Sequence, residues 1–197
     1  MNVDRRKFVK KTASLSLATG MASAMPFHIF ASNKSPNDTV NVALIGCKQR
    51  GYNVLKQHLK LPDVNCVAIC DIDNNVLEEK KADLANTHNQ KVKTYKDYRK
   101  MLEDKDIDAV IIGTPDHWHC LQTIHACQAE KDVYVEKPMA NSIEECNLMV
   151  KAARKYNRVV EVGQQQRSSQ VWNEVMDYIS TGKLGKLRRT NIWANFN

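Results

Sequence analysis

The first residues with chemical potential follow directly after a short apolar run. Residues 46–51 read Gly-Cys-Lys-Gln-Arg-Gly and come after Val42–Ile45. A strand, then Gly-x-Gly-x-x-Gly, then a helix is typical of dinucleotide binding. The first glycine makes a tight turn, the second lets the backbone approach the pyrophosphate, and the third packs the helix against the strand. Gly46 and Gly51 hold the first and third positions, and Lys48 replaces the second. Two glycines are a weak indication, which their place between the first strand and a helix strengthens.

Lys48 can act in two ways on a bound dinucleotide. A side chain at this position crowds the pyrophosphate, whereas an ammonium group beside a diphosphate gains charge-assisted contacts. We expect weakened or repositioned cofactor binding rather than improved binding.

Asp71 ends a second apolar run, about 20 residues after Gly51. At this distance a dinucleotide site carries an acidic residue that accepts hydrogen bonds from the adenosine ribose hydroxyls. A carboxylate here repels a 2′-phosphate, so Asp71 favours NAD over NADP. The alternative role is an ordinary turn or helix cap, but Asp73 suits the cap of the next helix better.

Two further polar segments also follow apolar runs. Gly113–His119 comes after Ala109–Ile112, and Glu136–Pro138 comes after Val133–Val135. Ligands of open α/β sheets bind at the carboxyl ends of the strands. A lysine at that edge, here Lys137, could bind a substrate hydroxyl and assist its loss of a proton. Each segment alone is equally compatible with a solvated loop.

The elements that position these segments alternate between strand and helix. Apolar runs without polar alternation indicate strands that are covered on both faces. The predicted strands are Val42–Ile45, Val64–Cys70, Val92–Tyr95, Ala109–Ile112, Val133–Val135 and Val159–Val162. The predicted helices are Tyr52–Lys60, Asn74–Asn86, Tyr98–Glu103, His119–Glu130, Ser142–Tyr156 and Ser169–Ser180. The sequence therefore predicts an α/β fold, a doubly wound parallel sheet of the Rossmann type with right-handed crossovers.

The first 31 residues are typical of an export signal. Asp4–Lys10 resembles the twin-arginine signal, a weakly apolar run follows, and Ala22–Ala24 or Ile29–Ala31 could be the cleavage site. We expect a periplasmic or otherwise exported protein that uses the twin-arginine export machinery, with residues 32–40 as a polar linker. A frayed basic helix is the alternative.

The net charge of +7 does not indicate a nucleic-acid partner. Five basic residues and one acidic residue lie within residues 1–11. The rest of the chain has mixed charges and no basic stripe interleaved with aromatic residues, which phosphate-backbone binding requires. No stretch reaches the roughly 18 apolar residues of a membrane-spanning helix. We expect neither nucleic-acid binding nor a stable membrane anchor.

The six cysteines do not have the pattern of a disulfide scaffold, because they fall on predicted strands, helices and the glycine loop. Cys66 and Cys70 are expected to face the same side of one strand, with thiols too far apart to bridge. We interpret the cysteines as small buried apolar residues.

A metal site is the alternative use of the histidines and cysteines between 117 and 127. His125 and Cys127 are two apart on a helix and face different sides, and Cys120 is expected to point into the core. We therefore expect no metal site.

Together, these segments resemble the Gfo/Idh/MocA oxidoreductases, a family named for glucose–fructose oxidoreductase and inositol dehydrogenase. The matching stretches, in the family's order, are Val42–Gly46 with Arg50-Gly51, Cys70–Asp73, Ile112–His119, Glu136–Pro138 and Val162–Arg167. The last two are the more specific, whereas the glycine motif is generic. The resemblance implies an NAD(P)-dependent oxidoreductase that acts on a small-molecule sugar, cyclitol or glycoside by hydride transfer, with NAD as the expected cofactor.

The resemblance also implies roles for individual residues. Lys137 is the expected catalytic residue. The expected cofactor-binding residues are Gly46, Lys48, Arg50, Gly51, Asp71, Thr114, Pro115, His119, Glu136 and Gln164. Within this set, Thr114, Pro115 and His119 are expected to line the cofactor cleft, and Glu136 to contact the nicotinamide end.

In this family a second, antiparallel domain shapes the substrate pocket, mediates oligomerisation and supplies a catalytic Asp and His. Only its first strand, Lys186–Trp193, is expected in this chain. We expect residues 41–167 to form the Rossmann domain and residues 168–197 a connecting helix with the start of a truncated second domain. A homo-oligomer is expected only for a full-length form.

Two functional interpretations remain open. In the first, the chain is the cofactor-binding half of an exported oxidoreductase, or of a relative that cleaves glycosidic bonds through transient oxidation. Glu136–Pro138 is closer to the dehydrogenase branch. In the second, the chain is a truncated product that binds dinucleotide and does not catalyse.

Overall fold

The computed structural model describes residues 39–193, which include all the predicted strands and helices. The predicted export signal at residues 1–31 and most of the predicted linker lie outside the described residues. Within residues 39–193, no helix combines the length and the apolar character needed to cross a membrane.

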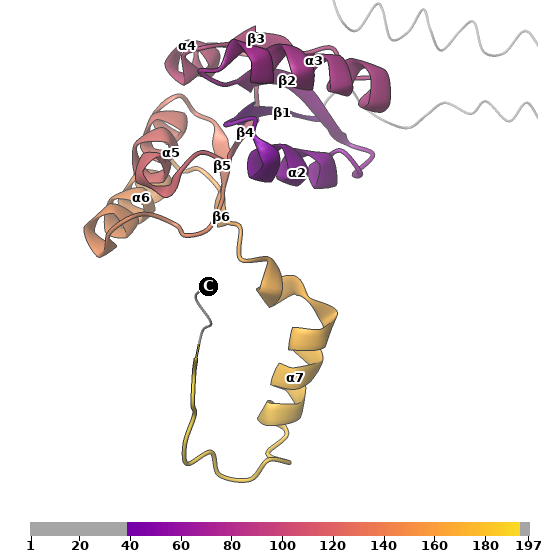
Figure 1. The fold of residues 1–197 in the computed structure, drawn as a ribbon. Helices are drawn as coiled ribbons and strands as arrows, with labels where there is room; N and C mark the ends of the chain where they lie inside the picture. The colour runs from indigo at the N-terminus through magenta and orange to yellow at the C-terminus, as the bar shows by residue number, and fades with distance from the viewer. Residues whose placement is uncertain (1–38, 194–197) are drawn as a thin grey trace, which may run out of the picture. The chain divides into compact units, whose positions relative to one another are not determined.

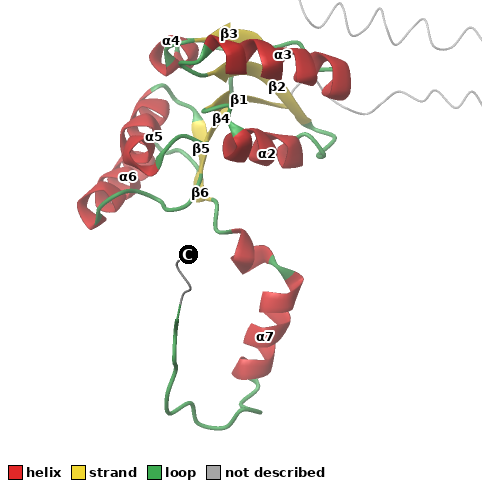
Figure 2. Ribbon diagram, viewed as in Figure 1, coloured by secondary structure: helices red, strands yellow, loops and turns green. Residues whose placement is uncertain are grey.

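Six parallel strands form one sheet in the order β3-β2-β1-β4-β5-β6, with helices packed around it (Figures 1 and 2). The strands are β1 (Val40–Ile45), β2 (Val64–Cys70), β3 (Lys93–Tyr95), β4 (Ala109–Ile112), β5 (Asp132–Val135) and β6 (Val160–Val162). This arrangement confirms the predicted doubly wound parallel sheet. It also matches the strand order of dinucleotide-binding α/β folds.

The strand order reverses between β1 and β4, which lie side by side in the middle of the sheet. From there the chain runs outward to β2 and β3 on one side and to β5 and β6 on the other. Because all the strands run in the same direction, their carboxyl ends meet at one edge. Ligands of such sheets bind at this edge, beside the reversal point.

Five helices cover the two faces of the sheet, and each face has its own apolar core. They are α2 (Gln49–His58), α3 (Asn74–His88), α4 (Tyr98–Leu102), α5 (His119–Gln128) and α6 (Ile143–Lys155). Helices α2 and α3 pack on strand residues such as Leu44 and Ile69. Helices α4, α5 and α6 pack on the opposite face, on residues such as Ile45 and Val135. The central strands are buried on both faces, as their unbroken apolar runs predict.

Helix α2 begins three residues before the predicted start at Tyr52. The sequence places the start after Gly51 because glycine is a poor helix former. In the structure Lys48 is the N-cap residue, and the Tyr52 N–H donates to the Lys48 carbonyl at 3.0 Å. Gly51 therefore lies in the first turn of the helix, where packing outweighs its low propensity.

Cys66 and Cys70 face opposite sides of β2, which corrects the expectation that they face the same side. The register of β2 against β1 shifts between Val42 and Ala43, so β2 carries one extra residue, Val67. A bulge of this kind breaks the alternation of a strand. Cys66 packs beneath α2 and α3, whereas Cys70 lies in the other core. All six cysteines are free. Five of them are buried as predicted, whereas Cys146 is only half-buried.

The strand predicted at Lys186–Trp193 is not formed. Helix α7 (Gln170–Ser180) comes first, close to the predicted bounds, and no residue of it is buried. Residues 187–193 then have no regular secondary structure. A strand needs a neighbour for its backbone groups, and the pairings found within residues 39–193 join only β1 to β6. Ile192 and Trp193 are exposed.

Candidate functional site at the carboxyl edge of the sheet

A cleft of about 610 Å³ opens at the carboxyl ends of β1, β2 and β4. One wall is formed by Asp71–Asp73 after β2, and another by Lys96–Arg99 between β3 and α4. The remaining lining comes from the turns after β1 and β4 and from the start of α5. Five of the predicted cofactor-binding residues line this one cleft, namely Gly46, Lys48, Asp71, Thr114 and Pro115.

Three glycines let two turns and a helix pack closely at the junction of β1 and β4. Gly46 has a φ of +86°, and a Cβ atom on it would lie 2.8 Å from the Thr114 nitrogen. A Cβ atom on Gly51 would strike the Gly46 carbonyl, and one on Gly113 would strike the Gly51 Cα atom. Gly51 therefore packs α2 against the sheet, and Gly113 completes that contact from the β4 side.

Lys48 replaces a loop glycine without backbone strain. Its φ of −70° and ψ of 178° are extended values that any residue adopts. Its exposed side chain lines the cleft. No side chain caps α2, and the first N–H groups of a helix have no partner within it. Such a helix start favours anions, because its free N–H groups and its dipole are both positive.

Asp71 joins the end of β2 to the glycine loop and keeps part of its hydrogen-bonding capacity. Its Oδ2 atom accepts from the Cys47 N–H at 2.8 Å, and its Oδ1 atom accepts from the Asp73 N–H at 3.1 Å. An ionised carboxylate can accept about four hydrogen bonds, so capacity remains for donors from a ligand. Asp73 caps α3 as predicted, since its side chain accepts from the Asn75 N–H at 3.0 Å.

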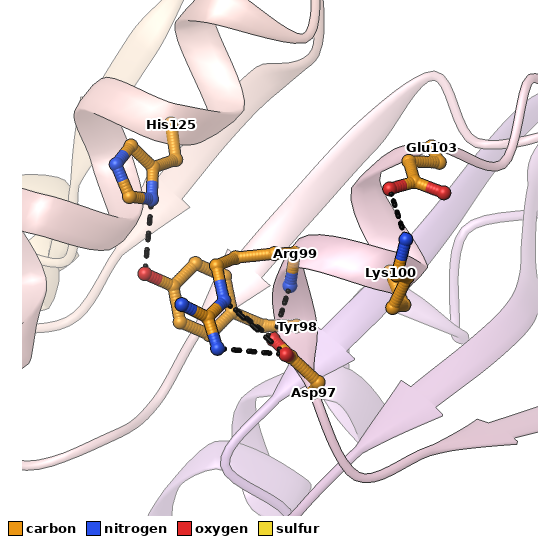
Figure 3. A network of polar contacts seen from close by, with 6 residues as sticks. All are labelled: Asp97, Tyr98, Arg99, Lys100, Glu103 and His125. Carbon is orange, nitrogen blue, oxygen red and sulfur yellow. Dashed lines mark hydrogen bonds and ion pairs between the residues drawn. The ribbon is translucent and has the colours of Figure 1, made fainter.

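The opposite wall contains a forked ion pair at the start of α4 (Figure 3). The Arg99 Nε and Nη2 atoms lie 2.9 and 2.8 Å from the two oxygens of Asp97. This hydrogen bonding lowers the pKa of Asp97 to about 2, so the carboxyl is ionised at neutral pH. Between them in sequence, Tyr98 points to α5, where its hydroxyl lies 3.0 Å from His125 Nδ1.

A second arginine–carboxylate pair lies at the end of β5. Glu136 is only 3% exposed, and its Oε1 atom lies 2.8 Å from Nη2 of Arg50 in the first turn of α2. Its Oε2 atom accepts from the Lys137 N–H at 3.1 Å. The Gln165 amide lies against this pair, with its nitrogen on the Gly163 carbonyl at 2.8 Å and its oxygen on Arg50. Two predicted cofactor-binding residues, Arg50 and Glu136, thus contact each other.

Lys137 and Gln164 are both exposed at the same edge, after β5 and β6 respectively. Within residues 39–193, no hydrogen bond or ion pair engages the Lys137 ammonium group. An unengaged ammonium group at the ligand-binding edge is free to contact a substrate.

His119 does not line the cleft, which corrects the expectation from the sequence. It is 1% exposed, with Nε2 at 2.8 Å from the Thr114 carbonyl and Nδ1 at 2.8 Å from the Pro138 carbonyl. A neutral ring donates to only one of these oxygens, whereas the doubly protonated ring donates to both. His119 thus joins the turn after β4 to the turn after β5. Thr114 is also held by its hydroxyl, which donates to Gln122 at 2.7 Å.

The sequence analysis missed several residues of the site. Asp97 precedes a helical pattern, so the sequence could have shown its role as a cap. Its pairing with Arg99 inside the cleft has no local signal. The same holds for Gly113 and Gln165, whose roles depend on contacts with residues far away in the chain.

Thiol and metal chemistry find little support at this edge. Burial raises the pKa of Cys70 to about 12, with smaller contributions from Asp71 and Asp97. Burial also raises the pKa of Cys47. The nucleophilic form of cysteine is the thiolate, so neither group is reactive at neutral pH. In the part of the chain that the structure describes, no group of three His, Cys, Asp or Glu residues could hold a metal ion.

Comparison with known proteins identifies the family. The model of the Gfo/Idh/MocA oxidoreductase family, NAD-binding Rossmann fold, matches residues 40–164. Among curated proteins, a glycosyl hydrolase family 109 protein of Shewanella baltica is 31% identical over 174 residues. The corresponding protein of Shewanella pealeana is 34% identical over 173 residues. These alignments cover 78% and 79% of this chain and 38% of each relative.

Solved structures of dehydrogenases share the fold. Myo-inositol 2-dehydrogenase from Lactobacillus plantarum is 27% identical, with a TM-score of 0.67 over 75% of this chain and 43% of that protein. The WlbA dehydrogenase from Bordetella pertussis, solved with NADH and UDP-GlcNAcA, has the same identity, TM-score and coverage. The chain spans about two fifths of the length of these relatives. It belongs to the Gfo/Idh/MocA oxidoreductase family and carries that family's NAD-binding Rossmann domain.

Proposed function

We propose that this domain binds NAD along its carboxyl edge and serves hydride transfer at a hydroxyl-bearing carbon of a sugar, cyclitol or glycoside. The observation that carries the proposal is the placement of Asp71 in the cleft and of the free Lys137 ammonium group at the same edge. The sugar and inositol dehydrogenases among its structural relatives support this substrate class.

The residues of the cleft fit the adenosine and diphosphate parts of NAD. Asp71 accepts from the ribose hydroxyls with the capacity that Cys47 and Asp73 leave open. The uncapped start of α2 and the Lys48 ammonium group lie where two phosphate charges need partners. Bound NAD supplies the acceptor or donor of the hydride.

Lys137 would act on the substrate hydroxyl. An ammonium group that donates to the hydroxyl oxygen stabilises the negative charge that develops as the proton leaves. Glu136 acts as a positioning residue, because it accepts from the Lys137 N–H and is itself held by Arg50. Gln164, at the end of the neighbouring strand, would contact the nicotinamide end of the cofactor.

Calorimetric titration of the chain with NAD tests the cofactor proposal. Wild-type protein should bind NAD saturably, and Asp71→Ala should weaken binding roughly tenfold, the effect of losing a hydrogen bond to a charged group. Asp106→Asn removes an exposed carboxylate outside the cleft and should leave affinity unchanged. Absence of saturable NAD binding by the wild type would contradict the proposal.

The role of Lys137 is tested with any form of the protein that turns over a substrate. Lys137→Ala should lower kcat roughly a hundredfold, a typical contribution of acid–base catalysis, and should change NAD affinity by less than about twofold. Lys151→Ala, on the exposed side of α6, is the matched control. Unchanged turnover in Lys137→Ala would remove this residue from the mechanism.

The curated relatives favour a second candidate, a glycosidase that oxidises its substrate only transiently. Both candidates use the same hydride transfer, but they differ in the balance of NADH. A dehydrogenase accumulates one NADH for each substrate oxidised, whereas the glycosidase releases sugar without net NADH. Parallel measurement of NADH absorbance and released sugar separates them.

Export and assembly are further parts of the proposal. The Arg5-Arg6 pair supports export by the twin-arginine route. A reporter fused to residues 1–38 should be exported from the cytoplasm. Replacement of both arginines by lysine should stop the export of the reporter. The exposed apolar residues of α7, such as Trp172 and Met176, support a homo-oligomer of a full-length form. Light scattering of that form checks its mass.

A further inference from the structure

The cleft wall opposite Asp71 carries charges that bear on the choice of cofactor. Residues 96–99 line the same cleft as Asp71. The two walls begin at paired strand ends, because the Asp71 N–H donates to the carbonyl of Tyr95, the residue before Lys96, at 3.2 Å. A group attached to the 2′ position of a ribose held by Asp71 would therefore lie close to the start of α4.

Arg99 is suited to binding a phosphate at that position, since a guanidinium fork matches the geometry of phosphate oxygens. In the structure this fork is already engaged. Its Nε and Nη2 atoms hold both oxygens of Asp97, at 2.9 and 2.8 Å (Figure 3). The Asp97 carboxyl is ionised at neutral pH, as an ordinary aspartate is, and its bond to Arg99 lowers its pKa further, to about 2. The pair therefore has no net charge.

The charges around the cleft depend on this carboxylate. The positively charged side chains that line the cleft are Lys48, Lys96 and Arg99. The negatively charged ones are Asp71, Asp73 and Asp97. With Asp97 ionised the two signs are equal in number. Without its charge the cleft has an excess of positive charge, and its arginine is released.

We propose that Asp97 is a second determinant of the preference for NAD over NADP. Asp71 repels a 2′-phosphate directly, and Asp97 withholds Arg99 from it. The inference rests on the proposed binding of NAD with its adenosine ribose at Asp71. It adds a residue from a different segment of the chain, the start of α4, to the control of cofactor choice.

The substitution Asp97→Asn separates this role from helix capping. The Oδ1 atom of Asp97 accepts from the Arg99 N–H at 3.0 Å and so caps α4. Asparagine caps helices about as well as aspartate, so Asp97→Asn keeps the cap and removes the charge. The double variant Asp97→Asn/Arg99→Ala removes the released cation as well.

A matched control is available on the same helix. Lys100 and Glu103 form an ion pair at 2.9 Å, drawn beside the Asp97–Arg99 pair in Figure 3. Neither residue lines the cleft. Glu103→Gln changes the net charge of the protein by the same amount as Asp97→Asn and frees a cation outside the cleft.

The test is calorimetric titration with NAD and with NADP, in the wild-type background and in an Asp71→Ser background. Asp97→Asn should raise NADP affinity relative to NAD roughly fivefold in both backgrounds, the range of a partly exposed charge pair. The gain should shrink at high salt. It should vanish in Asp97→Asn/Arg99→Ala and be absent in Glu103→Gln.

The outcomes are distinct. If NAD binds but Asp97→Asn leaves the NADP-to-NAD affinity ratio unchanged, the inference fails and the proposed function stands. A gain that persists without Arg99, or that Glu103→Gln reproduces, also overturns the inference. If the wild type binds neither nucleotide, the proposed function fails, and the inference fails with it.

Discussion

Each half of the carboxyl edge, on either side of the β1–β4 junction, contains one arginine–carboxylate pair, and the two pairs differ in burial. At β5, the Glu136 side chain is 4% exposed and its partner Arg50 comes from a distant helix. At α4, the Asp97 side chain is 40% exposed and its partner Arg99 is two residues away. Both pairs have the same N–O distance of 2.8 Å.

The difference shows that contact distance does not set the importance of an ion pair. A buried carboxylate without its partner keeps the cost of its lost hydration, whereas an exposed one regains water. The pair at β5 should therefore matter for folding and for the position of Lys137. The pair at α4 can be altered at little cost to stability, which suits residues that tune ligand choice.

Removal of Arg50 should have the largest effect. Arg50→Ala leaves the Glu136 carboxylate buried without its cation and should lower the free energy of unfolding by about 2 to 3 kcal/mol. Urea denaturation measures this. Arg50→Ala/Glu136→Gln should recover part of the loss, and Arg99→Ala, the same change at the exposed pair, should cost clearly less than Arg50→Ala. Equal losses from Arg50→Ala and Arg99→Ala would remove the distinction between the two pairs.

Replacement of His119 should have an intermediate effect within the β5 half. His119→Leu removes the buried ring that contacts the Thr114 and Pro138 carbonyls and should cost about 2 kcal/mol in thermal or urea unfolding. The neighbouring His117 side chain is 60% exposed, so His117→Leu should change stability by less than about 0.5 kcal/mol. A loss of the same small size in both variants would show that the two carbonyls do not depend on His119.

The smallest effect concerns the protonation of Asp97. Its pKa is lowered in the folded protein from its ordinary value of 3.8 to about 2, with the Arg99 hydrogen bond as the main cause. A depressed folded pKa means that the ionised group stabilises the fold above pH 3.8, and that this contribution is lost as the pH falls toward 2. NMR titration of the carboxyl should show a midpoint near 2 that rises in Arg99→Ala and not in Lys151→Ala. An ordinary midpoint in the wild type would contradict the forked pair.

Local patterns in the sequence were sufficient for most of the fold. Apolar runs such as Ala109–Ile112 predict buried strands, because a strand covered on both faces cannot alternate with polar residues. Asp73 predicts the start of α3, because its side chain satisfies a backbone N–H that the helix leaves free. The prediction of a strand at Lys186–Trp193 was wrong. A strand also depends on a neighbouring strand, which a local sequence pattern does not contain.

The candidate site could be predicted in part. The positions of Asp71 and Lys137 after their strands follow from the parallel order of the sheet, which brings strand ends to one edge. The burial of His119 between two carbonyls and the pairing of Arg50 with Glu136 do not follow, because each joins segments far apart in the chain.

The sequence by itself determined which segments become strands and helices, and which glycines and polar residues stand at the strand ends. These features depend on backbone propensity and hydrophobic pattern, which act over a few residues. Only the tertiary structure decided which side chains meet and which face apart. Glu136 is buried against Arg50, Asp97 holds Arg99 in the cleft that Asp71 also lines, and Cys66 faces away from Cys70. Such contacts depend on crossovers and a strand bulge, which set distances between residues that the local sequence does not relate.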